Sequence, residues 1–362
     1  MTNLDIARQR LHNQLITRRT LEKPRDVVEW LGAVQAQDYA AAKWAVGLRS
    51  RDVTDDDIEQ AFAGGAILRT HVMRPTWHFV SPADIRWMLA LTAPRVNAVN
   101  AFRYRELELD DAFFRWSNAV LAKALQGGKQ LTRAELVSVL KRAGIATDDL
   151  LRFAHIIMRA ELDGIVCSGA RRGKQFTYAL LDERAPQARM LDRDEALAEL
   201  ARRYFASHGP ATLQDFVWWS GLTVADARTG LEMVTSQLMH EVVDGQTYWF
   251  ATYTPPAKDL SQTAYLLPNY DEYTVGYKDR SAIFDASHTG RLDPRGGLLT
   301  SAMVLDGQIV GTWKRTFKKN TVVIEANPFV PLSTTETRAF AASANCYGAF
   351  LERPVNATFQ AE

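Results

Sequence analysis

One pattern recurs three times along the chain: two or three short helices followed by two strands joined by a tight turn. Its clearest instance lies in residues 195–250, where helical stretches precede two apolar runs separated by Asp244-Gly245. An Asp-Gly pair between apolar runs is the strongest short-range signal for a β-hairpin. The chain is therefore expected to be an α+β protein built from several small units, each closed by its own hairpin.

The first unit is expected over residues 1–115. Helices are predicted at about 4–16, 24–35 and 55–63, and a strand-like run follows over 67–80. Pro24 stands at a first-turn position, and Thr54 precedes acidic residues as a helix cap does. The second of these helices is expected to close at Gln35.

The second and third units are expected over residues 116–187 and 188–258. In the second, Thr132 caps a helix that runs to Ala143, a helix follows over 148–162, and strands at 164–168 and 175–180 flank a basic turn. That turn carries Arg171, Arg172 and Lys174 at its tip. In the third, helices at 195–207, 213–220 and 224–233 precede the Asp244-Gly245 hairpin, and Trp218-Trp219 is expected to pack in the core.

The last part of the chain, residues 259–362, is richer in strands. A first strand is expected from Gln262 to Pro268, a hairpin turns at Asp306-Gly307, a partner strand covers 321–325, and a final helix covers 334–347. The predicted architecture is three tandem winged-helix domains plus a C-terminal β-rich domain. Winged helices bind nucleic acid through a helix and a wing, and they also serve as protein-interaction and dimerisation modules.

Composition excludes several classes of protein. The 362 residues are 47% hydrophobic and 23% charged with a net charge of +1, so the totals do not indicate a globally basic nucleic-acid binder. The chain has no apolar run near twenty residues, no signal sequence, and only Cys167 and Cys346, which favours a cytoplasmic protein without membrane contact, disulfide framework or structural zinc. It is expected to be a monomer. Basic residues nevertheless cluster at Arg8, Arg10, Arg18 and Arg19, at Arg171, Arg172 and Lys174, and at Lys314, Arg315, Lys318 and Lys319.

Three segments carry a family resemblance: Val34-Gln35-Ala36-Gln37-Asp38, the run from Arg69 to Val80, and Leu266-Leu267-Pro268-Asn269-Tyr270-Asp271-Glu272-Tyr273. Together they resemble the AlkZ/YcaQ family of bacterial DNA glycosylases, and the match spans nearly the whole chain. The resemblance implies three tandem winged-helix domains and a C-terminal β domain that embrace DNA. The family's catalytic signature is Gln, an apolar residue, then Gln or Asp. Gln35, Ala36 and Gln37 fill it in the Gln-x-Gln form.

Two glutamines suit the chemistry that this resemblance implies. A purine alkylated at N7 is already cationic, so it leaves without protonation and no general acid is needed. Each amide offers a carbonyl acceptor and an N–H donor, so Gln35 and Gln37 can hold one water against the sugar without carrying charge. The expected activity is that of a monofunctional glycosylase, because no lysine is marked for Schiff-base chemistry and the nearest, Lys43, has no distinguishing context. Without this context, two such glutamines are ordinary surface residues.

Supporting residues are expected around this pair. Arg74, Thr76 and His78 are candidates near the lesion or a phosphate, although a core histidine bonded to the backbone explains His78 equally well. Asp38 either supports the glutamines or caps the following helix. A metal site from His71 and His78 lacks a third ligand, so no metal or other cofactor is expected.

Asp271 and Glu272 are neighbours in the chain and are not expected to share a site, because adjacent residues of a strand face opposite sides. A structural role that joins the C-terminal domain to the first unit is favoured for this motif. Asp271 remains an alternative stabiliser of positive charge on the sugar.

The expected partner is double-stranded DNA with alkylated or crosslinked bases. Arg171, Arg172 and Lys174, with Arg69, are predicted to contact its backbone. A non-catalytic winged-helix transcriptional regulator is the alternative from another class, and it would be indifferent to Gln35 and Gln37. A protein that confers resistance to a single genotoxin would use the same chemistry on one adduct.

Overall fold

A computed structural model describes residues 1–252, 263–292 and 297–359. Helices and strands are both abundant, so the predicted α+β class is confirmed. The chain divides into two compact units, each described separately here. Unit 1 contains Met1–Glu59, Ala198–Trp219 and Val224–Glu362, and unit 2 contains Gln60–Leu197 with Ser220–Thr223. Unit 1 therefore combines the N-terminal and C-terminal parts of the chain.

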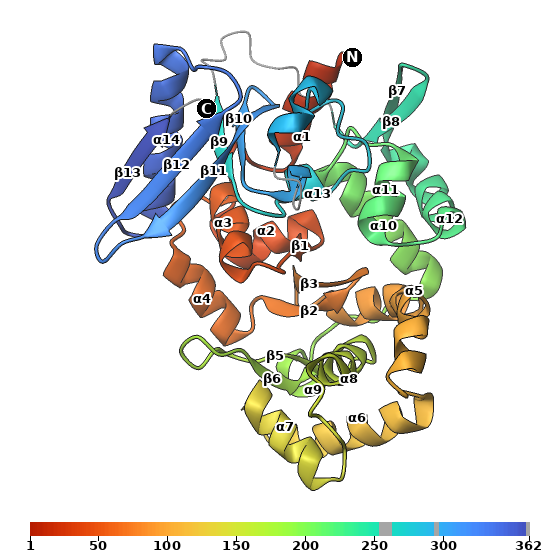
Figure 1. Ribbon diagram of the computed structural model, residues 1–362. Coiled ribbons are helices and arrows are strands. Elements are labelled where there is room, and N and C mark those ends of the chain that lie inside the picture. The colour runs from red at the N-terminus through yellow and green to blue at the C-terminus, as the bar shows by residue number, and fades with distance from the viewer. Residues whose placement is uncertain (253–262, 293–296, 360–362) are drawn as a thin grey trace. The chain divides into compact units, whose positions relative to one another are not determined.

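The N-terminal part of the chain is mostly helical (Figure 1). Its elements are α1 (Asn3–Asn13), α2 (Pro24–Leu31), β1 (Val34–Gln35), α3 (Tyr39–Arg49) and α4 (Asp55–Gly64). Pro24 opens α2 as predicted, but the helix ends at Leu31 instead of Gln35. The reason is Gly32, whose φ of 81° lies in a region that glycine alone enters freely. Gln35 consequently stands in a short strand.

Unit 2 contains a helical layer and two hairpins. Its elements are β2 (Leu68–Val72), β3 (Arg74–Val80), α5 (Ile85–Glu106), α6 (Asp111–Leu125), β4 (Leu131–Thr132), α7 (Arg133–Arg142), α8 (Leu150–Leu162), β5 (Val166–Ser168), β6 (Thr177–Leu180) and α9 (Leu181–Arg184). The predicted run over 67–80 is one antiparallel hairpin, which turns at Met73 with φ 62°. Thr132 and Glu135 form the capping box that starts α7, as the sequence suggested for Thr132.

The sheet of the second predicted domain has the strand order β4-β6-β5. Helices α6, α7 and α8 pack on it around Phe114, Leu121, Leu136, Ile156 and Val166. The basic turn joins β5 to β6. This arrangement places the turn beyond the ends of two strands that border this core.

Three helices and a hairpin follow, in the predicted order. They are α10 (Arg193–Ser207), α11 (Leu213–Ser220), α12 (Val224–Val234), the short η1 (Thr235–Gln237), β7 (Met239–Val243) and β8 (Gln246–Phe250). Asp244 and Gly245 have φ of 49° and 75°, the left-handed values that a two-residue hairpin turn of type I′ requires. Asp244-Gly245 was thus correctly predicted as the turn.

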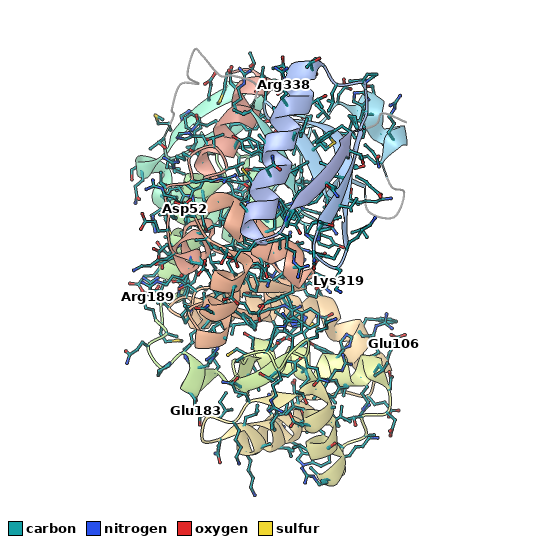
Figure 2. The ribbon with its side chains drawn as sticks, turned by 90° about the vertical axis from the view of Figure 1, so that its left-hand side faces the viewer. Asp52, Glu106, Glu183, Arg189, Lys319 and Arg338 are labelled. Carbon is teal, nitrogen blue, oxygen red and sulfur yellow. The ribbon has the colours of Figure 1, made fainter. Side chains whose placement is uncertain are left out.

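The C-terminal part forms a five-stranded sheet with one long helix. Its elements are β9 (Ala264–Leu267), α13 (Glu272–Val275), η2 (Ala286–Arg291), η3 (Gly297–Leu299), β10 (Ala302–Leu305), β11 (Gln308–Phe317), β12 (Val322–Pro328), α14 (Thr334–Phe350) and β13 (Val355–Phe359). The strand order is β13-β12-β11-β10-β9, and only the β12–β13 pair is parallel. Lys319 lies at the tip of the β11–β12 hairpin, and Arg338 lies on α14 at the other end of this layer (Figure 2).

Part of the predicted domain division falls outside the described residues. The boundary at 258–259 lies there, as does Gln262, the expected start of the first C-terminal strand. The four-domain division therefore stays a prediction.

Within unit 1, aromatic side chains attach α3 to the C-terminal sheet and helix. The Trp44 indole N–H donates to the Leu266 carbonyl of β9 at 2.8 Å. Its ring lies 4.9 Å from Tyr347 and 5.1 Å from Phe350 of α14, measured between centroids. Gly47 leaves room for Phe350, because a Cβ at this position would stand 2.4 Å from that ring. The helix that follows Gln37 is thereby fixed to the C-terminal domain.

Candidate active site

The segment Gln35-Ala36-Gln37 begins at the last residue of β1 and precedes α3 in unit 1. Gln35 is half-buried and Gln37 is exposed, whereas Ala36 between them is fully buried. Ala36 therefore anchors the segment in the core, while the glutamines on either side of it keep accessible surface.

A buried carboxylate lies beneath this segment. Glu272 Oε1 accepts the backbone N–H of Gln35 at 2.9 Å, and Glu272 Oε2 accepts the indole N–H of Trp219 at 2.9 Å. His208 Nε2 lies 3.4 Å from the same Oε2. All three of Glu272, Trp219 and His208 are completely inaccessible to solvent. The backbone of the first glutamine is thus tied to a charged group inside the protein.

Burial also sets the protonation behaviour around Glu272. It lowers the pKa of His208, and the neighbouring Glu272 opposes this shift only in part. The His208 ring stacks on Tyr204, with centroids 4.9 Å apart. Burial raises the pKa of the Tyr204 hydroxyl well above its ordinary value. The rings of His208, Trp219 and Tyr204 are therefore neutral, and they surround the Glu272 carboxylate in the core.

Asp271 has a separate partner. Its two oxygens accept hydrogen bonds from the Arg49 guanidinium at 2.7 and 2.8 Å, and both residues are fully buried. Arg49 also donates to Gln14 Oε1 at 2.8 Å. With both oxygens committed to Arg49 in the core, Asp271 does not fit the alternative role of stabilising charge on a sugar. The two adjacent carboxylates have different partners, and these contacts agree with the favoured structural role.

Asp38 and Asn269 complete this junction. Asp38 Oδ1 accepts the Ala41 N–H at 3.0 Å and so caps α3, one of the two roles expected for it. Its Oδ2 lies 3.5 Å from the Asn269 amide nitrogen, and Ser301 Oγ donates to Asn269 Oδ1 at 2.7 Å. The segment Asn269 to Glu272 therefore contacts the N-terminal part of the chain at three residues, Gln35, Asp38 and Arg49.

Arg74, Thr76 and His78 belong to unit 2, where β3 brings them together. His78 is fully buried, its Nδ1 lies 2.9 Å from the Thr76 carbonyl oxygen, and its Nε2 lies 3.5 Å from Arg74 Nη2. These contacts agree with the interpretation of His78 as a core histidine bonded to the backbone. The Thr76 hydroxyl oxygen is buried without a hydrogen-bond partner among the described residues.

The second histidine of this hairpin is used differently. His71 Nδ1 bonds the carboxylate of Glu161, which is itself buried. No group of three His, Cys, Asp or Glu side chains suitable for a metal ion occurs within 1–252, 263–292 and 297–359. His71 is thus part of a buried histidine–carboxylate pair in unit 2.

The predicted DNA contacts lie in unit 2 and differ in their surroundings. Lys174 is exposed. Arg172 pairs with Glu135 at 2.9 Å, and the pKa of Glu135 falls to about 2 because the Thr132 N–H and Arg172 both bond its carboxylate. Arg69 is only 8% exposed, and its guanidinium lies between Trp77 and Phe176, 4.3 and 4.5 Å from their ring centroids. The Arg171 guanidinium also lies over Phe176, 5.3 Å from the centroid of its ring.

Trp218, Trp219 and Lys43 were also considered from the sequence. Trp219 is a core residue as predicted, but Trp218 is 44% exposed, so the prediction for it was wrong. Trp218 lies about 100° from Trp219 around α11, on the side of the helix that also carries the exposed Gln214. Lys43 pairs with Asp55 at 2.7 Å and with Glu59 at 3.0 Å.

Sequence reasoning missed Glu272, His208 and Trp219 as neighbours of the glutamines. These residues lie far from Gln35 along the chain, whereas helix and strand patterns relate only residues a few positions apart. No such pattern therefore indicates that they are neighbours. The available signal was the position of Glu272 inside a polar segment that follows the apolar β9 run.

The family model for AlkZ-like DNA glycosylases matches residues 28–350, and the chain belongs to this family. The family confirms that the chain is an enzyme of this class and sets aside the regulator alternative.

Two relatives support the assignment. A Streptomyces sahachiroi protein described as an interstrand DNA cross-link repair glycosylase is 26% identical over 330 residues, which cover 84% of this chain and 85% of that protein. The solved structure of Streptomyces sahachiroi DNA glycosylase AlkZ superposes with a TM-score of 0.80 at 22% identity, over 99% of this chain and 100% of the other. The second comparison shows a shared fold. Among the described residues, no helix has the length and apolar character needed to cross a membrane.

Proposed function

We propose that this glycosylase hydrolyses the N-glycosidic bond of N7-alkylated purines, including those that form interstrand crosslinks. The side chains of Gln35 and Gln37 would hold the attacking water. The observation that carries the proposal is the anchoring of this segment: Ala36 is buried, and the Gln35 N–H is bonded by the buried Glu272 at 2.9 Å. A segment fixed in this way positions two amides without spending binding energy to order them.

The chemistry needs orientation more than proton transfer. An N7-alkylated purine leaves as a neutral base, so the enzyme has to direct water at C1′ and stabilise an oxocarbenium-like sugar. Amide carbonyls supply partial negative charge and accept hydrogen bonds from water. Amides are too weak as bases to assist departure of an undamaged, neutral purine. The site should consequently be selective for cationic adducts.

The crosslink part of the proposal rests on the relative from Streptomyces sahachiroi, whose name states that activity. A base that is covalently joined to the opposite strand cannot be flipped out of the duplex. An enzyme for such lesions must bring its water to the base within the helix.

DNA is expected to contact the hairpins of the helix–helix–hairpin units, which we interpret as three tandem winged-helix domains, followed by the β-rich domain. In unit 2 the order α6, β4, α7, α8, β5 and β6 supports this interpretation. Lys174, Arg171 and Arg172 would contact phosphates, and Arg69 would hold the base of the wing through Phe176. Arg74, Thr76 and His78 are proposed to support the lesion site. The protein is expected to act as a monomer in the cytoplasm, without a cofactor.

The test uses duplex DNA that carries one N7-methylguanine or one nitrogen-mustard crosslink. Wild-type protein is expected to generate alkali-labile sites under single-turnover conditions. Gln35→Ala and Gln37→Ala should each lower the rate roughly 10²-fold, as loss of a preorganised polar group does.

Gln126→Ala is the matched control, because Gln126 is an exposed glutamine at the end of α6 in unit 2. It should excise at the wild-type rate. If both substrates stay intact with wild-type protein that binds the duplex, the proposed substrate class is wrong. If excision occurs and neither glutamine variant slows it, the water is held elsewhere.

A further inference from the structure

A cavity of about 210 Å³ lies inside unit 2, between the β2–β3 hairpin, α8 and β6. Its walls include the aromatic side chains of Trp77, Phe153 and Tyr178, and its lining also includes His71 and His155. An engineered apolar cavity of about 150 Å³ binds benzene, so a volume of this size accommodates one ring or two fused rings. Flat walls of aromatic rings favour a planar ligand.

His155 offers this cavity a hydrogen-bond acceptor. Its Nδ1 lies 2.9 Å from the Leu151 carbonyl oxygen, one turn earlier on α8. A carbonyl oxygen only accepts, so Nδ1 carries the proton and Nε2 of the neutral ring has a free lone pair. Among the described residues Nε2 has no hydrogen-bond partner, although the side chain is only 8% exposed. An acceptor of this kind at a cavity wall can form a hydrogen bond with a ligand or water that supplies a donor.

His71 is fixed as one wall of the cavity. Its Nδ1 bonds the Glu161 carboxylate, and its ring lies 4.5 Å from the Trp77 ring, measured between centroids. Because a carboxylate only accepts, this contact holds the His71 ring in one orientation. Arg133 lies at the exposed side of the cavity, with its guanidinium 4.8 Å from the Phe153 ring centroid. The walls are therefore preorganised, which lowers the cost of ordering them on binding.

We propose that this cavity binds a planar heteroaromatic molecule of one or two fused rings that donates an N–H to His155 Nε2. Free nucleobases belong to this chemical class. The ring stacks against Trp77 and His71, and the N–H satisfies the unpaired nitrogen. The site is distinct from the glutamine site, because its lining belongs to unit 2 whereas Gln35 and Gln37 belong to unit 1. The proposal does not depend on the chemistry at Gln35 and Gln37.

The test compares indole with benzothiophene, which has the same shape but a sulfur in place of the N–H. Isothermal titration calorimetry on the full chain is expected to give a dissociation constant of about 1 mM or lower for indole. Benzothiophene should bind at least about fivefold more weakly, because it offers no hydrogen-bond donor to His155 Nε2. His155→Phe keeps an aromatic ring and removes the acceptor, so it should make the two affinities equal.

Ala154→Leu adds bulk to the lining and should abolish binding of both compounds. Ala134→Leu places the same substitution on an exposed position of α7 and should leave binding unchanged. Thermal melting shows whether each variant folds. If Ala154→Leu does not fold, the comparison of wild type with His155→Phe is sufficient for the test. No binding of indole to wild-type protein, or equal affinities of both compounds for it, would overturn the proposal.

Discussion

Glu272 shows how one buried residue can determine where a reacting group lies. Its two oxygens accept N–H bonds from different parts of the chain, the Gln35 backbone and the Trp219 indole. An amide in the same place offers one acceptor, and its NH2 group would face an N–H donor. The carboxylate is thus required by its two acceptors as much as by its charge.

Glu272→Gln is therefore expected to slow excision while leaving DNA affinity unchanged. Leaving one buried donor unpaired costs about 1–3 kcal/mol, which corresponds to roughly tenfold or more in rate if the misplaced donor is Gln35. Single-turnover excision and equilibrium DNA binding measure the two effects separately. Glu325→Gln, an exposed position on β12, is the matched control. An unchanged excision rate in folded Glu272→Gln would show that Glu272 does not position Gln35.

His208 gives a pH dependence whose sign follows from its burial. Its pKa is lowered in the folded protein, so below about pH 6.5 the unfolded chain binds a proton that the folded chain does not. This proton binding favours the unfolded state, and stability falls as pH decreases through that range. His208→Phe keeps a ring against Tyr204 but does not titrate. The urea midpoint of the wild type should fall further than that of the variant between about pH 7.5 and 5.5. Equal falls would contradict the assignment.

At the scale of elements, the wing of unit 2 distributes its cations unequally. Arg172 is paired with Glu135, and Arg171 lies against Phe176, whereas Lys174 is exposed at the turn. A cation that is already paired gains less from a phosphate, because it must give up its partner. Lys174 should hence contribute most to DNA binding among the three.

Lys174→Ala is expected to reduce the slope of log K against log salt by about 1, the value for one lost phosphate contact. The affinity should fall by a similar factor for any duplex sequence. Fluorescence anisotropy over a range of salt concentrations measures the slope. Lys123→Ala removes an exposed lysine on α6 and should leave the slope unchanged. Identical slopes for wild type and Lys174→Ala would exclude this wing from the DNA contact.

Local signals explain which elements could be predicted. The Asp-Gly hairpins and the Thr132 cap were predicted correctly because each is decided by the residues of the turn itself. The end of α2 was missed because Gly32 was read as part of an apolar helix. The turn at Met73 was not predicted, because non-glycine residues rarely adopt positive φ and no Gly, Asn or Asp stands next to it.

The site was predictable only in part, for a related reason. Gln35 and Gln37 were found because they form a short motif in a family resemblance. Their support by Glu272 depends on contacts between residues far apart in the chain, which periodicity does not encode. The adjacent carboxylates Asp271 and Glu272 were correctly assigned to different surroundings, but no local pattern indicated the partner of either residue.

At the scale of the whole molecule, the buried Arg49–Asp271 pair joins the first and last parts of unit 1. Both side chains are inaccessible, so removing one partner leaves an uncompensated charge in the core. Such a change costs about 3–5 kcal/mol, whereas replacement of both partners by apolar residues costs much less. Unit 1 is then expected to lose stability as one body.

Asp271→Asn should accelerate hydrogen exchange in α3 and in β9 together, since both belong to the unit that the pair holds. Peptides of α6, α7 and α8 in unit 2 should exchange at the wild-type rate. Mass-spectrometric hydrogen exchange resolves these peptides in the full chain, and Arg49→Met with Asp271→Leu should recover part of the protection. If Asp271→Asn affected β9 alone, the N-terminal and C-terminal parts of unit 1 would open independently, and the pair would not bind them into one cooperative structure.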